Sequence, residues 1–316
     1  MPSRPLIVRL RNWVGDAILG IPLLQRLEDA GYDLRLVGKG WARDLLAGHG
    51  WTVETLPAST RERVAQLRRL REQARAEDPG FGRRIQALVL PDSFSSALEM
   101  RLAGLRALGH QHEGRGWLLQ RALPRPGLQH EMAVYWALGS ALLDQAAPVP
   151  DRITLRTAPQ HEAQARALRE QLGLRPGYVV VCPFAGGTFE KLDKCWPDFP
   201  RLVAEALPPL GRDVVICPGP GEEAAIAARD YGSCRVAHGV GLGAYAVLLR
   251  DAALVIANDT GPGHMAAAVG APLLSVLGPT DPARWGAVGP TVQVLRAAAG
   301  WPTLDDVTAR ARDRLG

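Results

Sequence analysis

Lysine is scarce in this sequence of 316 residues, although basic residues are not. Only Lys39, Lys191 and Lys194 supply lysine among the 37 basic residues, so the remaining 34 are arginines. We interpret most arginines as composition and solvated surface, because charged side chains usually stay in water. The net charge of +5 suits phosphates, nucleotides or an acidic membrane surface, but is small for a dedicated nucleic-acid binder. The few lysines are therefore worth locating.

Cysteine pairs and long apolar runs are also lacking. The four cysteines form no C-x-x-C pair, and Cys182 and Cys217 each end an apolar run beside a proline. This pattern favours buried reduced thiols over disulfides or a metal site. No apolar run approaches the roughly 18–20 residues of a membrane span. The N-terminal segment has no signal-peptide pattern, so we expect a cytoplasmic protein.

Two common nucleotide-binding motifs are missing. Gly38-Lys39-Gly40 lacks the third glycine of G-x-G-x-x-G, because Arg43 stands in its place. No G-x-x-x-x-G-K-[ST] P-loop is present either. Both absences disfavour an NAD-dependent oxidoreductase and a P-loop NTPase.

Predicted strands alternate with predicted helices along the chain, which is typical of parallel, doubly wound α/β sheets. Three prolines between 145 and 159 indicate a linker. We therefore expect two Rossmann-like domains, 1–150 and 151–316, with parallel sheets facing each other across a cleft. The stretch 104–127 is irregular and rich in Arg, Gly and His, and predicts a short strand with exposed loops.

Ligands of open parallel sheets bind beyond the carboxyl ends of strands, at helix N-termini. The loop 258–265 follows a predicted strand and opens a helix, with Asp259 or Thr260 as a possible cap and Pro262 in the first turn. Free N–H groups there could hold a diphosphate. The alternative is a well-capped turn without a ligand.

A second loop, 184–197, holds two of the three lysines, Lys191 and Lys194, and the pair Gly186-Gly187. The glycines permit close approach of the backbone, and a lysine can neutralise a phosphate as a point charge. The alternative reading is solvated surface lysines, which the preference of this chain for arginine weakens.

Three further positions are candidates. The loop 277–282 also follows a strand, and the loop 219–223 places Glu222 and Glu223 where a carboxylate could hold a ribose diol or simply stabilise a helix N-terminus. In the first domain, Asp16 comes just after the first strand, so it could take a proton from an acceptor hydroxyl or act as a helix N-cap.

In combination these loops resemble the ADP-heptose:lipopolysaccharide heptosyltransferase family, which has the GT-B architecture. The matching segments are 12–16 with its Gly-Asp, Lys194-Cys195-Trp196-Pro197, 259–266 as D-T-G-P-x-H-x-A, and 278–282 as G-P-T-D-P. These segments occur in the same order as in the family, and the resemblance extends over nearly the whole chain. The last two at this spacing are the specific signal. Gly263 replaces a frequent methionine, and 186–193 differs from the family in length and composition.

The resemblance implies a role for each matched residue. Asp16 would be the general base, Lys194 would bind the donor diphosphate and Asp259 would contact the donor sugar. The expected donor-binding residues are Gly186, Gly187, Thr188, Lys191, Glu222, Glu223, Asp259, Thr260, Gly261, Pro262, Gly263, His264, Thr280 and Asp281, with Asn12 and Gly15 on the acceptor side. Glu223 fits the spacing for a ribose contact better than Glu222. His264 is expected to form hydrogen bonds rather than act as a base.

The implied function is inverting transfer of heptose from ADP-heptose to a lipopolysaccharide core acceptor, with no metal and no cofactor. No D-x-D motif is positioned for Mg²⁺, so a lysine and a helix N-terminus would stabilise the departing diphosphate. The acceptor would be a phosphorylated glycolipid at the inner membrane face, where the arginines of 61–75 could contact lipid or simply form a solvated helix. The alternatives are a transferase or epimerase for another nucleotide sugar, and a catalytically silent nucleotide- or glycan-binding protein.

Overall fold

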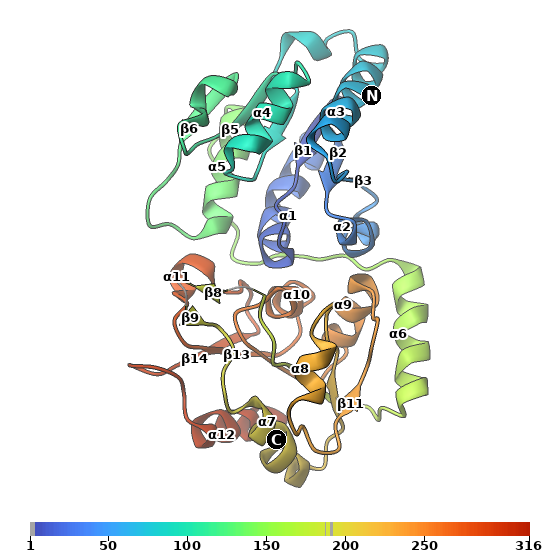
Figure 1. The fold of residues 1–316 in the computed structure, drawn as a ribbon, viewed down its shortest axis with the longest axis vertical. Coiled ribbons are helices and arrows are strands. Elements are labelled where there is room, and N and C mark those ends of the chain that lie inside the picture. Colours follow the sequence, from blue (N-terminus) through green and yellow to red (C-terminus); the bar gives the residue numbers. More distant parts are fainter. Residues whose placement is uncertain (1–3, 187, 190–191) are drawn as a thin grey trace. The chain divides into compact units, whose positions relative to one another are not determined.

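The computed structural model describes residues 4–186, 188–189 and 192–316. Its internal contacts divide the chain into two compact units, whose elements are labelled in Figure 1. Unit 1 runs to Leu46 and continues over Gly50–Pro150, and unit 2 comprises Ala47–His49 and Asp151–Gly316. His49 contributes to this grouping because its Nε2 accepts a hydrogen bond from the backbone N–H of Arg156 at 3.2 Å.

Unit 1 is built on a parallel sheet of six strands in the order β3-β2-β1-β4-β5-β6. The strands are β1 (Pro5–Arg9), β2 (Asp33–Gly38), β3 (Thr52–Thr55), β4 (Ala87–Val89), β5 (Ala107–Gln111) and β6 (Arg121–Pro124). Its helices are α1 (Val14–Asp29), α2 (Trp41–Leu45), α3 (Thr60–Glu77), α4 (Phe94–Leu102) and α5 (Glu131–Leu143). Every residue of β1 and β4 is buried. Strands that are covered on both faces have nearly continuous apolar sequences, as these two do.

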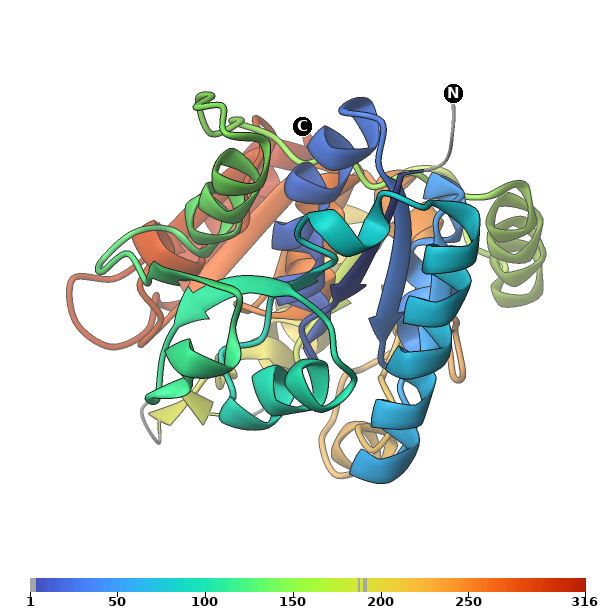
Figure 2. The same ribbon diagram turned by 90° about the horizontal axis from the view of Figure 1, so that it is seen from above.

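Helices cover both faces of this sheet. On one face α3 and α4 pack on a core that includes Ile7, Leu67 and Met100. The α1 and α5 helices pack against each other on the other face, as Figure 2 shows. Helix α3 buries Leu67 and Leu70 and begins with a capping box between Ser59 and Glu62. The two layers of helices leave ligand access mainly at the strand ends.

The prediction for 104–127 is wrong, because this stretch forms two paired strands rather than one. Strand β5 is buried except for its last residue, and β6 extends the sheet beside it. The β5 strand contains His110, whose ring contacts the carbonyl oxygens of Pro124 at 3.2 Å and Val134 at 2.8 Å. A histidine and a glycine inside the strand broke the apolar pattern, although the histidine ring is buried against two backbone carbonyl oxygens.

Unit 2 repeats the same strand order in its own numbering, β11-β10-β7-β12-β13-β14. These parallel strands are β7 (Val179–Cys182), β10 (Val214–Ile216), β11 (Arg235–Val236), β12 (Leu254–Ala257), β13 (Leu273–Leu277) and β14 (Val292–Arg296), with an additional antiparallel hairpin of β8 (Thr188–Phe189) and β9 (Leu192–Asp193). The helices are α6 (Pro159–Leu172), α7 (Phe199–Arg201), α8 (Glu223–Ala227), α9 (Leu242–Arg250), α10 (Gly261–Ala268), α11 (Pro282–Trp285) and α12 (Leu304–Leu315). The predicted α/β class with two parallel sheets is confirmed.

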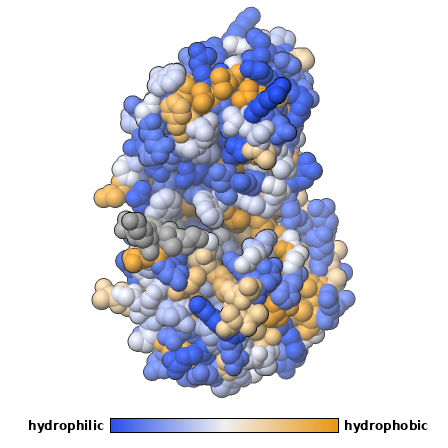
Figure 3. All heavy atoms as spheres, viewed as in Figure 1, coloured by the Kyte–Doolittle hydropathy of each residue, from blue (hydrophilic) through white to orange (hydrophobic). Residues whose placement is uncertain are grey.

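Both units show a largely hydrophilic face with smaller apolar patches in Figure 3. Within the described ranges no helix is long and apolar enough to cross a membrane. Large exposed apolar side chains do occur in unit 1, among them Trp13 and Trp117. Of the two cysteines that were predicted to be buried, Cys182 is buried and Cys217 is only partly buried.

Several arginines of α3 are engaged within unit 1. Arg63 pairs with Glu99 at 3.1 Å, and Arg69 pairs with Glu54 at 2.5 Å. Arg71 donates to the carbonyl oxygen of Ala103 at 2.8 Å. These contacts favour the interpretation of α3 as a solvated, internally paired helix over a lipid-binding surface.

Candidate active site

Each parallel sheet brings together one pair of strands that are far apart in the sequence. The sequence-distant strands β1 and β4 are neighbours in unit 1, and β7 and β12 are neighbours in unit 2. Because the chain leaves these pairs toward opposite faces of the sheet, their carboxyl ends form the switch point where α/β proteins bind ligands. The loops after these four strands contain most of the predicted site residues.

Asn258 ties the loops of the unit 2 switch point together. Its side chain is 1% exposed. Its Nδ2 donates to the carbonyl oxygen of Pro183 at 2.8 Å, and its Oδ1 accepts from the backbone N–H of Trp196 at 2.9 Å. Trp196 is itself buried and donates from Nε1 to the carbonyl oxygen of Pro302 at 2.9 Å. This anchoring fixes the backbone two residues after Lys194.

Asp259 brings together three of the predicted residues. Its Oδ2 lies 3.5 Å from Lys194 Nζ, and its Oδ1 lies 3.5 Å from His264 Nε2. Burial alone would raise the pKa of Asp259, but hydrogen bonds from His264 and Thr280 and the charge of Lys194 together hold it below the ordinary value. The carboxylate is therefore ionised and held from two sides, beside a lysine that is only partly buried.

The N-terminus of α10 differs from the predicted cap. Thr260 occupies the N-cap position, but in the described structure neither it nor Asp259 caps the helix through its side chain. The Asp259 oxygens face Lys194 and His264 instead. Gly261 and Pro262 open the helix, and a Cβ on Gly263 would lie 3.1 Å from the carbonyl oxygen of Asn258. The backbone packs closely here, and the N–H groups of the first turn remain available to an anion.

The glycine and lysine loop is described only in part. Gly186 is exposed, and Thr188 lies in the β8–β9 hairpin. The predictions for Gly187 and Lys191, and for the Thr188 side chain, fall outside the described residues and side chains. Lys194 follows the hairpin directly.

The two glutamates bond within their own turn. Glu222 is the N-cap residue of α8, and its Oε2 accepts from the backbone N–H of Gly219 at 2.7 Å. The Oε2 atom of Glu223 accepts from the N–H of Gly221 at 2.9 Å. Both carboxylates thus accept hydrogen bonds from backbone N–H groups of the loop after β10.

The last donor-side loop follows β13. Thr280 is 1% exposed and contributes to the hydrogen bonding of Asp259. Asp281 is the N-cap of α11, with its Oδ1 accepting from the N–H of Ala283 at 3.0 Å. Thr280 therefore joins the Asp259 cluster, whereas the side chain of Asp281 serves the short helix.

In unit 1, Asp16 is not a helix N-cap. Trp13 occupies that position, and Asp16 lies in the first turn of α1, after Gly15. Its Oδ1 accepts a hydrogen bond from the Tyr135 hydroxyl at 3.2 Å, and its Oδ2 lies 3.6 Å from Arg11 Nε. The Asp16 side chain is 12% exposed. The predicted base is thus a partly accessible carboxylate at the end of β1.

A charged network surrounds Asp16 that the sequence did not reveal. Arg11 Nη1 donates to Asp92 Oδ2 at 3.1 Å, and Arg125 Nε donates to the same oxygen at 3.2 Å. The second arm of Arg125 reaches Glu131 Oε1 at 2.7 Å. Arg11 and Asp92 follow β1 and β4 directly, so the rule that selected Asp16 could also have selected them. Asn12 bonds Arg9 instead, through its Oδ1 at 2.9 Å.

The histidines form no metal centre in the described parts of the chain. Throughout those parts, no group of three or more His, Cys, Asp or Glu is arranged to hold a metal ion. His130 caps α5, because its Nδ1 accepts from the N–H of Met132 at 3.2 Å. His264 hydrogen-bonds Asp259, which agrees with its expected role.

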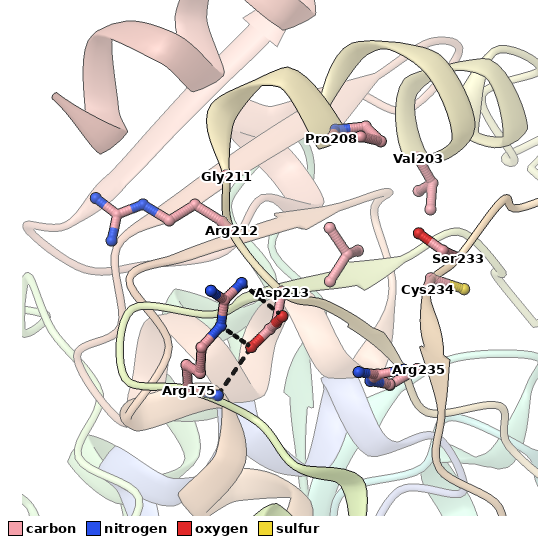
Figure 4. A pocket seen from close by; sticks show the side chains of 10 residues that line it. Arg175, Val203, Pro208, Gly211, Arg212, Asp213, Ser233, Cys234 and Arg235 are labelled. Atoms are coloured by element: carbon pink, nitrogen blue, oxygen red, sulfur yellow. Dashed lines mark hydrogen bonds and ion pairs between the residues drawn. The ribbon is translucent and has the colours of Figure 1, made fainter.

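A cavity of about 260 Å³ in unit 2 lies away from these loops. It is near the amino ends of β10 and β11, and Figure 4 shows Arg175 turned onto Asp213 at its rim. Arg175 is a bidentate partner of Asp213, with distances of 3.0 Å from both Nε and Nη2. The ion pair already satisfies this arginine, and the position is opposite to the switch point.

Known proteins are similar to this chain in sequence and in fold. Residues 84–310 match the sequence profile of glycosyltransferase family 9 (heptosyltransferase). Lipopolysaccharide heptosyltransferase 2 of Escherichia coli K12 is 26% identical over 92% of this chain and 87% of its own length. Lipopolysaccharide heptosyltransferase 3 of the same strain is 33% identical, but the match spans only 37% of this chain and 35% of that relative.

Similarity of structure extends over the whole chain. The structure of Escherichia coli ADP-heptose lps heptosyltransferase II superimposes with a TM-score of 0.80 at 24% identity, covering 98% of each chain. This likeness confirms the GT-B fold that the motifs indicated. Taken with the family profile, which matches most of the sequence, it leads to one conclusion: the chain belongs to glycosyltransferase family 9, the heptosyltransferase family.

Proposed function

We propose that this protein transfers heptose from ADP-heptose to the inner core of lipopolysaccharide, with inversion at the anomeric carbon. The cluster of Lys194, Asp259 and His264 beside the α10 N-terminus carries the proposal. It combines a cation, an ionised carboxylate and open backbone donors at the switch point of one unit. Family membership and the relatives named for ADP-heptose and lipopolysaccharide support the choice of donor and acceptor.

Unit 2 would bind the donor. Lys194 and the first N–H groups of α10 would neutralise the diphosphate, because a point charge and a helix N-terminus both stabilise phosphate. Asp259 would contact the heptose hydroxyls, with His264 and Thr280 holding its orientation. Glu223 or Glu222 would hold the ribose, because the turn after β10 already orients both carboxylates through backbone hydrogen bonds.

Unit 1 would bind the acceptor, with Asp16 as the general base. Asp16 would remove the proton of the acceptor hydroxyl while the oxygen attacks the anomeric carbon from the face opposite the diphosphate. A single displacement of this kind inverts the anomeric configuration. Lys194 and the α10 N-terminus would stabilise the charge that develops on departing ADP. The acceptor would be a Kdo or heptose residue of a phosphorylated glycolipid, reached from the cytoplasmic side of the inner membrane.

A transfer assay with ADP-heptose and a lipid-linked Kdo acceptor tests the proposal. We expect turnover by the wild type and a loss of at least about a hundredfold in kcat for Asp16→Asn, the usual range for removing a general base. Calorimetry should detect binding of ADP. Binding of UDP without ADP would instead identify a transferase or epimerase for another nucleotide sugar, and ADP binding without any transfer would identify a silent binding protein.

A further inference from the structure

Tyr135 is a buried phenol whose hydroxyl reaches the proposed base. It lies on α5 with only 1% of its surface exposed, and its hydroxyl donates to Asp16 Oδ1 at 3.2 Å. A buried tyrosine hydroxyl requires a hydrogen-bond partner, and here the partner comes from α1. Because α1 and α5 pack against each other, the contact is fixed by the core of unit 1.

The direction of this hydrogen bond is determined by the acidity of the two groups. Burial, together with the negative charge of Asp16, raises the pKa of Tyr135 well above its ordinary value. The phenol therefore stays protonated near neutral pH and acts as the hydrogen-bond donor to the carboxylate. One oxygen of Asp16 is thus permanently occupied.

The other oxygen of Asp16 has a different neighbour. Arg11 Nε lies 3.6 Å from Oδ2, a distance suited to charge attraction but longer than a hydrogen bond. Arg11 is held by Asp92 at 3.1 Å, and its guanidinium carbon lies 5.8 Å from the centre of the Tyr135 ring. The attachment of Arg11 to Asp92 keeps it from closing over Oδ2, whose lone pairs can receive a proton.

We propose that Tyr135 is a positioning residue that occupies Oδ1 of Asp16 and thereby presents Oδ2 to the acceptor hydroxyl. The inference rests on the proposed function of Asp16 as base. In the reaction, the acceptor O–H proton moves to Oδ2 while the acceptor oxygen bonds to the anomeric carbon. The bond between that carbon and the phosphate oxygen breaks, and its electron pair leaves with ADP.

The charged groups around Asp16 are balanced, so a substitution of the neutral Tyr135 side chain does not change the net charge of the site. They come from every element of unit 1 that packs here: Arg11 after β1, Asp92 after β4, Arg115 before β6, Arg125 after β6 and Glu131 on α5. With Asp16 included, three arginines face three carboxylates. Replacing the neutral phenol with phenylalanine leaves this balance unchanged and removes only the hydrogen bond.

The test is the pH dependence of transfer by Tyr135→Phe. We expect kcat to fall about tenfold because the base loses its fixed orientation, with the KM for ADP-heptose unchanged. Losing a donor to the ionised form raises the pKa of a carboxyl group. The acidic limb of the kcat profile should therefore move to higher pH, a change that a merely structural role would not produce.

Tyr178→Phe is the matched control. Tyr178, which directly precedes β7 in unit 2, is also buried. Its hydroxyl donates to the carbonyl oxygen of Leu248 at 2.8 Å. This variant should keep the wild-type kcat and the wild-type acidic limb. If Tyr135→Phe does not fold, 3-fluorotyrosine at position 135 replaces it: the stronger donor should move the limb to lower pH.

The outcomes separate the two proposals. A Tyr135→Phe or fluorotyrosine variant that keeps the wild-type profile, while Asp16→Asn is inactive, overturns the positioning role and leaves the base in place. Wild-type turnover by Asp16→Asn overturns the proposed base and the role of Tyr135 with it. A shifted limb in the Tyr135 variants, with Tyr178→Phe unchanged and Asp16→Asn inactive, supports both.

Discussion

The backbone N–H of Trp196 donates to Asn258 Oδ1 at 2.9 Å, which ties the loop after β7 to the loop after β12. The same asparagine donates to the carbonyl oxygen of Pro183. One side chain therefore sets the spacing of the two loops that carry Lys194 and Asp259.

Asn258→Ala should damage both the fold and nucleotide binding. It leaves a buried N–H and a buried carbonyl without partners, each costing about 1–3 kcal/mol. We expect the free energy of unfolding in urea to fall by about 2–4 kcal/mol and ADP binding, measured by calorimetry, to weaken about tenfold. Asn12→Ala is the control, because Asn12 bonds Arg9 in unit 1. An equal loss of ADP affinity in both variants would contradict this role of Asn258.

Lys194→Met should weaken ADP binding by about tenfold or more, because it removes a charge-assisted contact to the diphosphate, which is about twice as strong as a neutral one. Calorimetry at low ionic strength measures the change. Lys39→Met provides the matched loss of a lysine, since Lys39 is exposed at the end of β2. Adenosine, which lacks the diphosphate, should bind both variants equally. If Lys194→Met binds ADP like Lys39→Met, the diphosphate lies elsewhere.

The stability contributed by Asp259 should depend on pH. Its pKa is depressed in the folded state, despite burial, by His264, Lys194 and Thr280. Folding therefore favours the ionised form, and the carboxylate stabilises the protein above its ordinary pKa of 3.8. The benefit is lost as the pH falls through the lower folded pKa.

We expect Asp259→Asn to be less stable than the wild type by about 1 kcal/mol at neutral pH, from the loss of a charge-assisted hydrogen bond. The difference should shrink below about pH 4 as the wild-type carboxyl group protonates. Urea denaturation across this range measures it. A difference that is constant from neutral pH to about pH 2.5 would show that ionisation of Asp259 is not involved.

Arg125→Met should destabilise unit 1 strongly. Glu131 is completely buried, and Arg125 is its direct charged partner at 2.7 Å. Removing one member of a buried pair costs about 3–5 kcal/mol, because the other charge remains without compensation. Adding Glu131→Gln should restore much of the loss in chemical denaturation. Arg201→Met, which removes an arginine from an exposed pair with Asp198, should change stability by less than about 1 kcal/mol.

Alternating strands and helices are sufficient to predict the fold class. The apolar run Leu254–Ala257 is predicted with the bounds that β12 has, because a buried parallel strand has a continuous apolar pattern. The pattern fails at β5, where His110 is buried with its two ring nitrogens against backbone carbonyl oxygens of distant residues. Local hydrophobicity does not report a polar side chain that distant segments will bond.

The candidate site is predictable where it depends on loops that follow strands. That rule selects the loops that contain Asp16, Lys194 and Asp259, and the family resemblance then singles out these three residues. It does not reveal the hydrogen bond from Tyr135 to Asp16 or the bracing role of Asn258, because these contacts join residues far apart in the chain. Nor can it show that Asp281 is used as a helix cap.

The strand order of both sheets also determines when, during synthesis, the loops with the candidate site residues can come together. In unit 1, Ile7 pairs with Ala87, and in unit 2, Val179 pairs with Leu254. Each switch point lies between one early and one late strand, so neither exists on a nascent chain until the later strand has left the ribosome. A chain that stops short of β12 would carry Asp16 and its charged network, but it would lack the Asp259 loop on which the proposed donor site depends.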